Sequence, residues 1–402
     1  MPQLIANERV DDIPLLLGQM EKINLSGLVD EHFTQHGNWQ GLSVGKVIAG
    51  WLSYLLSQGD HRLNQVESWA SGLSCTLGSC LSPEVRSLDF SDDRLERILD
   101  RLSDDEQWDK FEGALNRQTV RIYDLPVECV RLDTTTSSGY RPVEADGLFQ
   151  FGHSKDYRPD LPQVKISQSA LDPLGLPVST SIVSGNQADA PLYIPEIKKV
   201  QQSLQSSGLT YVGDSKMAAL KIRGYLAQSQ NDYLCPLSEK QVSKADLAEL
   251  LAPVFRGEER LTQVFSPDVT GAAPSSEAIT AAECERIAEG FTLTMPQSIG
   301  TGAEQFSWRE QWLVVHSLKY AKRQQKGLDS RLENATDALT QMNQTGRGHK
   351  RLSLEQTTQT ANQILQRYRV KDLLQVAYEQ TTETVIRCQG GRQVNDSGCR
   401  AS

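Results

Sequence analysis

The feature that most constrains the fold is a run of strand-forming residues that ends in an aspartate and three threonines. Residues 127–132 are β-branched or apolar at alternating positions, which is typical of a β-strand. Asp133 follows at or just past the expected strand end, before residues 134–136, which are all threonine. A carboxylate at the end of a buried strand needs a cation or hydrogen-bond donors. A helix N-cap and a divalent metal ion would each satisfy it, and this stretch alone fits both interpretations.

A second stretch repeats the pattern. Residues 209–212 form another short β-type run, Asp214 follows it, and a helical pattern covers residues 217–226. Two aspartates at the ends of adjacent strands can converge on one metal site. Mg²⁺ is usually bound by one or two carboxylates together with waters and substrate phosphates. Two such ions can stabilise the attacking and leaving oxygens of a phosphodiester.

The segment between these aspartates predicts a hairpin and a helix. Residues 164–171 and 178–183 alternate as strands around a Pro-Leu-Gly-Leu-Pro turn, and residues 192–204 have amphipathic helical spacing. The predicted order is therefore strand with Asp133, hairpin, helix, strand with Asp214, helix. This is the order of an RNase H-like core, so we expect an α/β fold.

Four sequence blocks in this order make the chain resemble DDE transposases of the insertion-sequence 4 superfamily, most closely its insertion-sequence 1634 branch. The blocks are Leu-Asp-Thr-Thr at 132–135, Gly-His-Ser-Lys-Asp-Tyr-Arg-Pro-Asp-Leu at 152–161, Gly-Asn at 185–186 with Asp189, and Val-Gly-Asp at 212–214. The Ser-Lys-Asp-x-Arg-Pro-Asp run is the most discriminating of them. The resemblance spans about residues 10 to 380.

The resemblance implies a DNA transposase that cleaves and transfers the strands of an insertion sequence with Mg²⁺ or Mn²⁺. Asp133 and Asp214 would be catalytic carboxylates and metal ligands. Lys155 and Arg158 would contact DNA, because such side chains neutralise phosphate, and His153 beside them is a further candidate. The implied partners are double-stranded DNA, as transposon ends and target, and a second copy of the chain in a homodimer. The implied location is the bacterial cytoplasm, in association with the nucleoid.

The third carboxylate of such families, a glutamate in a Tyr-x2-Arg-x3-Glu pattern, is not found. Tyr320 has Arg323 at the right distance, but Gly327 stands at the glutamate position. We therefore expect a chain truncated at its C-terminus, with that part of the core missing and activity in doubt. Within the chain, Glu304 and Glu310 are the first candidates for a third ligand.

The pattern predicts a helical N-terminal domain over 1–122, the first part of the RNase H-like core over 123–235, and a β-rich insertion over 236–318. Charged helices over 319–385 and an irregular tail over 386–402 follow. The N-terminal domain would bind DNA ends or dimerise. The seven cysteines lack Cys-x2-Cys spacing, which favours reduced thiols over disulfides or zinc. No apolar run reaches the length of a membrane span, so no membrane partner is expected.

The net charge of −10 is unusual for a DNA-binding protein, but the charge is uneven. Basic residues are concentrated late in the chain, at Lys319, Lys322, Arg323, Lys326, Arg331, Arg347, Lys350, Arg351, Arg367, Arg369 and Lys371. They fit either a solvated helix face or a phosphate-binding patch, and both interpretations stay open. A haloacid-dehalogenase-type phosphatase is disfavoured, because it needs a second aspartate where Thr135 stands. The remaining alternative is a non-catalytic remnant that binds DNA or full-length transposase.

Overall fold

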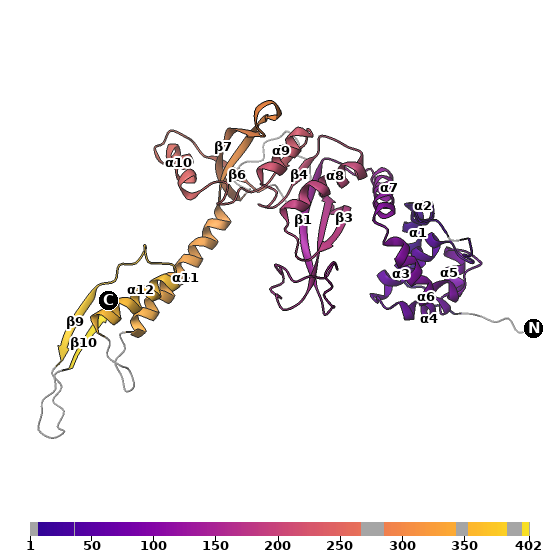
Figure 1. Ribbon diagram of the computed structural model, residues 1–402, viewed down its shortest axis with the longest axis horizontal. Coiled ribbons are helices and arrows are strands. Elements are labelled where there is room, and N and C mark those ends of the chain that lie inside the picture. The colour runs from indigo at the N-terminus through magenta and orange to yellow at the C-terminus, as the bar shows by residue number, and fades with distance from the viewer. Residues whose placement is uncertain (1–6, 36, 267–284, 343–352, 384–395, 402) are drawn as a thin grey trace, which may run out of the picture. The chain divides into compact units, whose positions relative to one another are not determined.

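The computed structural model describes residues 7–35, 37–266, 285–342, 353–383 and 396–401. Side chains are described up to residue 379, except for that of residue 303. The chain forms two compact units (Figure 1). One comprises residues 1–248 and 296–308, and the other comprises residues 249–295 and 309–402. The division falls inside a helix and two strands, so the domain boundaries drawn from the sequence stay predictions.

Helices make up the start of the first unit, as the sequence predicts. They are α1 (Ile13–Lys22), α2 (Leu25–His32), α3 (Val44–Gln58), α4 (Val66–Ser71), α5 (Ser74–Cys80), α6 (Asp92–Leu102) and α7 (Asp105–Tyr123), with 3-10 turns η1 (Leu63–Gln65) and η2 (Ser87–Phe90). The sequence predicts a buried helix over residues 44–56, with Ser43 as its cap and Trp51 in the core. Ser43 caps α3 by accepting a hydrogen bond from the Lys46 amide at 3.3 Å. Trp51 is buried in a core of aliphatic and aromatic side chains, in agreement with a packing role.

A five-stranded mixed sheet forms the rest of the first unit. Its strands are β1 (Cys129–Ser138), β2 (Gln163–Leu171), β3 (Leu176–Ser184), β4 (Thr210–Val212) and β5 (Asp232–Leu234), in the spatial order β3-β2-β1-β4-β5. β1, β2 and β3 pair antiparallel, whereas β4 pairs parallel with β1 and with β5. The strand–hairpin–helix–strand–helix order predicted from the sequence is present, with η3 (Ala190–Leu192), α8 (Tyr193–Leu204) and α9 (Leu220–Gln228) between strands.

β1 is longer than the sequence analysis predicts, so the prediction that Asp133 lies at the strand end is wrong. The strand continues through the threonines to Ser138, and its pairing with β2 runs from Val130 to Ser138. Threonine is β-branched and has a high strand propensity, so the change from apolar to hydroxyl side chains does not end the strand. Thr134 and Thr136 are buried at inward positions that continue the period of two set by Val130 and Leu132.

Helix α8 covers one face of the sheet, and α7 ties the helical region to it. Glu196 of α8 is buried and accepts hydrogen bonds from the hydroxyls of Ser169 and Ser181 at 2.9 and 3.0 Å. Asn116 of α7 donates to the Val178 carbonyl at 2.7 Å and to the Ser203 hydroxyl at 3.1 Å. These contacts join α7, β3 and α8 through polar groups that are buried or partly buried.

The elements after β5 are α10 (Lys244–Phe255), β6 (Thr262–Phe265), β7 (Arg286–Ile299), the 3-10 turn η4 (Gly302–Glu304), β8 (Phe306–Ser317), α11 (Leu318–Met342), α12 (Leu354–Arg367), β9 (Tyr378–Glu383) and β10 (Asp396–Ala401). β6, β7 and β8 form a three-stranded sheet, and β9 pairs with β10. The sequence analysis predicts an irregular tail over 386–402, but residues 396–401 form a strand in antiparallel register with β9.

The sequence predicts a loop rich in Pro, Gly, Ala and Ser over residues 267–276 and a helix break over residues 346–350. Both segments lie outside the described residues. Among the helices that the structure describes, none combines the length and apolar composition needed to cross a membrane.

Candidate metal and nucleic-acid site

The pairing of β1 with β4 makes Asp133 and Asp214 neighbours. Arg131 stands opposite Val212 at the last position of this parallel pairing. Asp133 and Asp214 each follow two residues later, Asp133 still within β1 and Asp214 beyond the end of β4. Adjacent strands lie about 4.8 Å apart, which is close enough for both carboxylates to approach one ion. The strands that precede the two aspartates are therefore neighbours in the sheet, and the shared metal site stays a prediction.

Lys155 lies along the edge of β1 that β4 leaves uncovered. The Glu128 carbonyl accepts a hydrogen bond from the Thr210 amide of β4, so the even-numbered carbonyls of β1 point toward β4. The Thr134 carbonyl points the same way, beyond the end of β4, and accepts a hydrogen bond from the Lys155 ammonium. The ammonium also donates to the Thr134 hydroxyl at 3.1 Å, so a lysine takes the place that a longer β4 would occupy.

The Asp133 carboxylate lies on the exposed face of β1, where 83% of its side chain is open to solvent. The Lys155 ammonium is 3.7 Å from its Oδ1 atom, and the Thr134 amide donates to the same oxygen at 2.7 Å. A carboxylate with this exposure keeps most of its lone pairs available to an incoming cation or phosphate-bound ion.

Asp214 is held in place by two donors. The Tyr193 hydroxyl donates to Asp214 Oδ1 at 2.6 Å, and the Lys216 amide donates to the same atom at 2.8 Å. Burial raises the pKa of Tyr193, and the hydrogen bond to Asp214 and the charges of Asp214, Asp133 and Asp189 raise it further. The Tyr193 hydroxyl therefore remains protonated and fixes the orientation of Asp214.

A buried ion pair beside these aspartates was not predicted as such from the sequence. Lys165 of β2 is only 5% exposed, and its ammonium is 2.6 Å from Asp189 Oδ1 and donates to the Gln187 carbonyl. Burial acts to raise the pKa of Asp189, but the hydrogen bond from Lys165 and the charges of Lys165, Lys155 and Lys216 outweigh it and lower the pKa. The sequence does not mark Lys165, because the apolar Val164 and Ile166 on either side of it would place it on the outward face, whereas the structure buries it.

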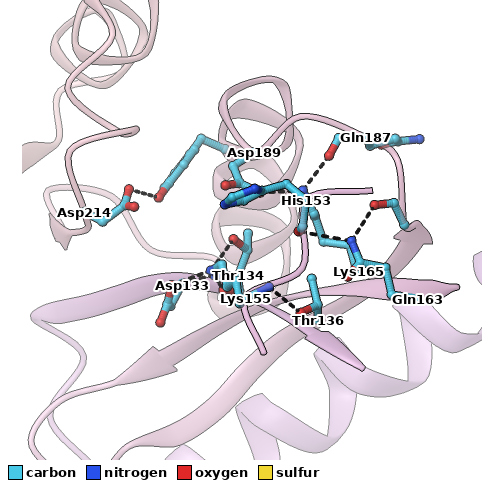
Figure 2. A network of polar contacts seen from close by, with 12 residues as sticks. Asp133, Thr134, Thr136, His153, Lys155, Gln163, Lys165, Gln187, Asp189 and Asp214 are labelled. Carbon is cyan, nitrogen blue, oxygen red and sulfur yellow. Dashed lines mark hydrogen bonds and ion pairs between the residues drawn. The ribbon is translucent and has the colours of Figure 1, made fainter. Parts of the chain in front are cut away.

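Figure 2 shows these side chains together: Asp133, Thr134 and Thr136 from β1, His153 and Lys155 from the β1–β2 loop, Lys165 from β2, and Asp189 and Asp214. His153 is exposed, and its carbonyl accepts from the Gln163 side chain at 3.1 Å. Arg158 forms two 2.8 Å hydrogen bonds to Asp160, which raise its pKa and offset part of its charge. The roles predicted for Lys155, Arg158 and His153 in DNA binding stay predictions.

No third carboxylate joins Asp133 and Asp214 among the described residues, where no group of three or more His, Cys, Asp or Glu side chains is arranged to hold a metal ion. Glu304 lies in η4 between β7 and β8. Glu310 is buried on β8, where it accepts a hydrogen bond from the Trp312 indole at 2.8 Å. The suggestion that either one completes the site is not supported by these positions.

Comparison with known proteins gives one family match. Residues 5–113 match a family described as "Domain of unknown function (DUF4277)". That range covers the helical region and ends before the sheet. No curated protein matches the chain.

Similar solved structures include a piggyBac transposase synaptic complex with hairpin DNA, at 15% identity and a TM-score of 0.32, with 63% of this chain and 56% of that chain covered. They also include a Mos1 transposase paired-end complex with left transposon end, at 9% identity and a TM-score of 0.20, with 61% and 85% covered. The chain thus spans little more than half the length of the piggyBac protein. Similarity at these TM-scores carries no argument about fold or chemistry, so the functional argument rests on the residues of the site.

Proposed function

We propose that this chain is a transposase-type protein with an RNase H-like core, and that it cleaves and joins DNA strands with a divalent metal ion held by Asp133 and Asp214. The observation that supports the proposal is the register of β1 and β4, in which Arg131 stands opposite Val212, two residues before Asp133 and Asp214. The strand order β3-β2-β1-β4-β5, antiparallel on one side of β1 and parallel on the other, supports this choice of fold.

The donors at the site fit Mg²⁺ or Mn²⁺. Both are carboxylates, Asp133 is largely exposed, and Mg²⁺ commonly takes only one or two protein carboxylates beside water and phosphate oxygens. When bound, such an ion supplies Lewis-acid polarisation of a phosphodiester and activation of a water molecule.

The side chains of the chain itself would orient the carboxylates and bind the DNA backbone. Tyr193 fixes Asp214 through its 2.6 Å hydrogen bond, and the Lys165–Asp189 pair holds the segment just before Tyr193 against β2. Lys155 places a positive charge 3.7 Å from Asp133, so it would bind the phosphate next to the scissile bond. When a cation binds to Asp133, this ammonium has to turn away from the carboxylate toward the phosphate.

A second candidate function is DNA binding without cleavage. The observation that favours it is the lack of a third metal-binding side chain at this site within the described residues. Both candidates predict duplex binding that weakens steeply with salt, because contacts to phosphate release counterions. Changing Lys155 and Arg158 to alanine should reduce both the affinity and the salt dependence. Only the first candidate predicts cleavage.

The decisive experiment measures Mn²⁺ binding by electron paramagnetic resonance, together with nicking of supercoiled plasmid. We expect Asp133→Asn and Asp214→Asn each to abolish a Mn²⁺ site that survives in Asp232→Asn, a control at the opposite end of the parallel strands. Lys155→Ala should tighten Mn²⁺ binding, because it removes a competing charge 3.7 Å from Asp133.

Mn²⁺ binding that is unchanged in both aspartate variants would refute the metal site. Mn²⁺-dependent nicking that is lost in Asp133→Asn would support the enzyme. Salt-sensitive DNA binding without nicking would support the non-catalytic alternative.

A further inference from the structure

The loop of residues 139–162, between β1 and β2, presents two tyrosines to solvent. Tyr140 is 86% exposed and Tyr157 is 92% exposed. Moving an aromatic ring out of water lowers the free energy. Because these two rings are not buried in the fold, a binding partner that covers them would be stabilised in this way. This position follows β1 directly, on the chain segment that returns to the candidate site.

The backbone at Tyr157 is in a conformation that bulky residues rarely adopt. Its φ is +57°, in the left-handed region, where glycine is the residue that meets no steric cost. The turn is closed on both sides, because the Arg158 amide donates to the Ser154 hydroxyl at 3.1 Å and the Leu161 amide donates to the Arg158 carbonyl at 3.2 Å. A strained position that carries a fully displayed side chain indicates a functional role for that side chain.

A guanidinium group lies beside Tyr140. Hydrogen bonds to Asp160 and then to the Tyr140 hydroxyl raise the pKa of Arg158, so this side chain stays charged and lies against Tyr140. Arg158 directly follows Tyr157 in the chain. The loop therefore joins two exposed rings and one cation in a small area, a combination that single-stranded nucleic acid recognises by base stacking and backbone contact.

The loop is fixed to the candidate site by Lys155, which binds Thr134 and lies 3.7 Å from Asp133. Tyr157 is two residues away, and two residues of chain span at most about 7 Å. The exposed ring therefore belongs to the same loop that contacts β1 beside Asp133, where it can reach a strand whose phosphate lies at Asp133 and Asp214.

We propose that Tyr157 and Tyr140, together with Arg158, form a stacking surface for unpaired bases of the DNA strand whose phosphate lies at Asp133 and Asp214; this rests on the proposed function. Bases within a duplex are already stacked on their neighbours, so an outward ring gains little from them. Unpaired bases have free faces and stack on tyrosine whatever their identity. The surface therefore selects a single-stranded segment or an opened strand end.

The test compares two fluorescein-labelled DNA probes by fluorescence anisotropy: a blunt duplex, and the same duplex with a single-stranded thymidine overhang. We expect the full chain to prefer the overhang. Tyr157→Ala should weaken overhang binding by about five- to 100-fold, the range for losing one stacked base, and leave blunt-duplex binding unchanged. Tyr140→Ala should act in the same direction, and Tyr157→Phe should retain the preference because it keeps the ring.

The matched control is Phe255→Ala, since Phe255 is a similarly exposed ring, 83% open to solvent, at the end of α10. It should change neither affinity. Equal binding of the two probes, an overhang preference unaffected by Tyr157→Ala, or no DNA binding at all would overturn the stacking surface. Failure of the proposed function is detected by a separate measurement: Mn²⁺ binding would be the same in Asp133→Asn and Asp214→Asn as in the natural chain.

Discussion

Removing the ammonium group of Lys165 should destabilise the five-stranded sheet beside the candidate site. Lys165→Met keeps most of the aliphatic stem but leaves Asp189 without its nearest partner and the Gln187 carbonyl without its donor. Breaking a buried ion pair by removing one partner costs about 3–5 kcal/mol. The Asp189 side chain is 19% exposed, and Lys155 and Lys216 remain near it, so the lower end of that range applies. We expect a loss of about 3 kcal/mol.

Hydrogen–deuterium exchange is the suitable assay, because it reports the stability of this sheet by itself in a chain of two units. Peptides from β2 and β3 should exchange about 100-fold faster in Lys165→Met, since each 1.4 kcal/mol of opening free energy changes the rate about tenfold. Asp189→Asn in the same chain should recover part of the loss, because it removes the uncompensated charge.

The matched control is Lys199→Met. Its ammonium is 2.9 Å from Asp109 Oδ1, but both side chains are partly exposed, at 31% and 42%. Such surface pairs contribute about 0–1 kcal/mol, so exchange should rise about fivefold at most. Equal effects of Lys165→Met and Lys199→Met would refute the buried-pair argument.

The effect should also depend on pH. The pKa of Asp189 is lowered in the fold, so its pairing contributes stability above the unfolded pKa of about 3.9 and loses it as the pH falls through the folded value. The exchange difference between the natural chain and Lys165→Met should be full at neutral pH and should shrink below about pH 4. A difference that stays constant across this range would contradict the assignment to Asp189.

Two further predictions concern the junction of α7 with the sheet. Burial raises the pKa of Glu112 to about 7. The chain should therefore lose stability as the pH rises from the unfolded pKa of about 4.3 toward 7. Glu112→Gln should have a higher Tm than the natural chain at pH 8 and an equal Tm near pH 4. Asn116→Ala should lower the free energy of unfolding by about 2 kcal/mol, because it leaves the buried Val178 carbonyl without its side-chain donor, and it should accelerate exchange in β3. Unchanged exchange in β3 would show that this hydrogen bond does not stabilise the junction.

The position of the regular elements could be predicted from the sequence where apolar periodicity is strong. Helices α3 and α8 and strands β2 and β3 all agree with the expected ranges within a few residues, because each buries one face. The strand β10 was missed because residues 396–401 show no alternation of apolar and polar side chains. Its pairing with β9 is a long-range contact that local sequence does not encode.

The candidate site was predictable in its aspartates and not in their surroundings. Asp133 and Asp214 each follow a short apolar run, and that local pattern is enough to mark both. The Lys165–Asp189 pair joins residues that are distant in the chain, and it depends on the antiparallel register that sets Lys165 opposite Thr136. The contact of Lys155 with β1 depends on where β4 ends, which again is a property of the sheet and not of the sequence around Lys155.

The site exists because β1 and β4 differ in length. β1 has ten residues, and the threonines after Asp133 extend it, whereas β4 has three. Gly213 directly follows β4, and a Cβ atom there would lie 2.7 Å from the sulfur of the buried Met217, so a glycine allows this close approach. The chain can therefore pass close to Met217 and turn away from β1, which leaves the Thr134 carbonyl for Lys155 and Asp133 open to solvent. A β4 as long as β1 would cover this edge, and the two aspartates would then be part of a continuous sheet with no room for a phosphate.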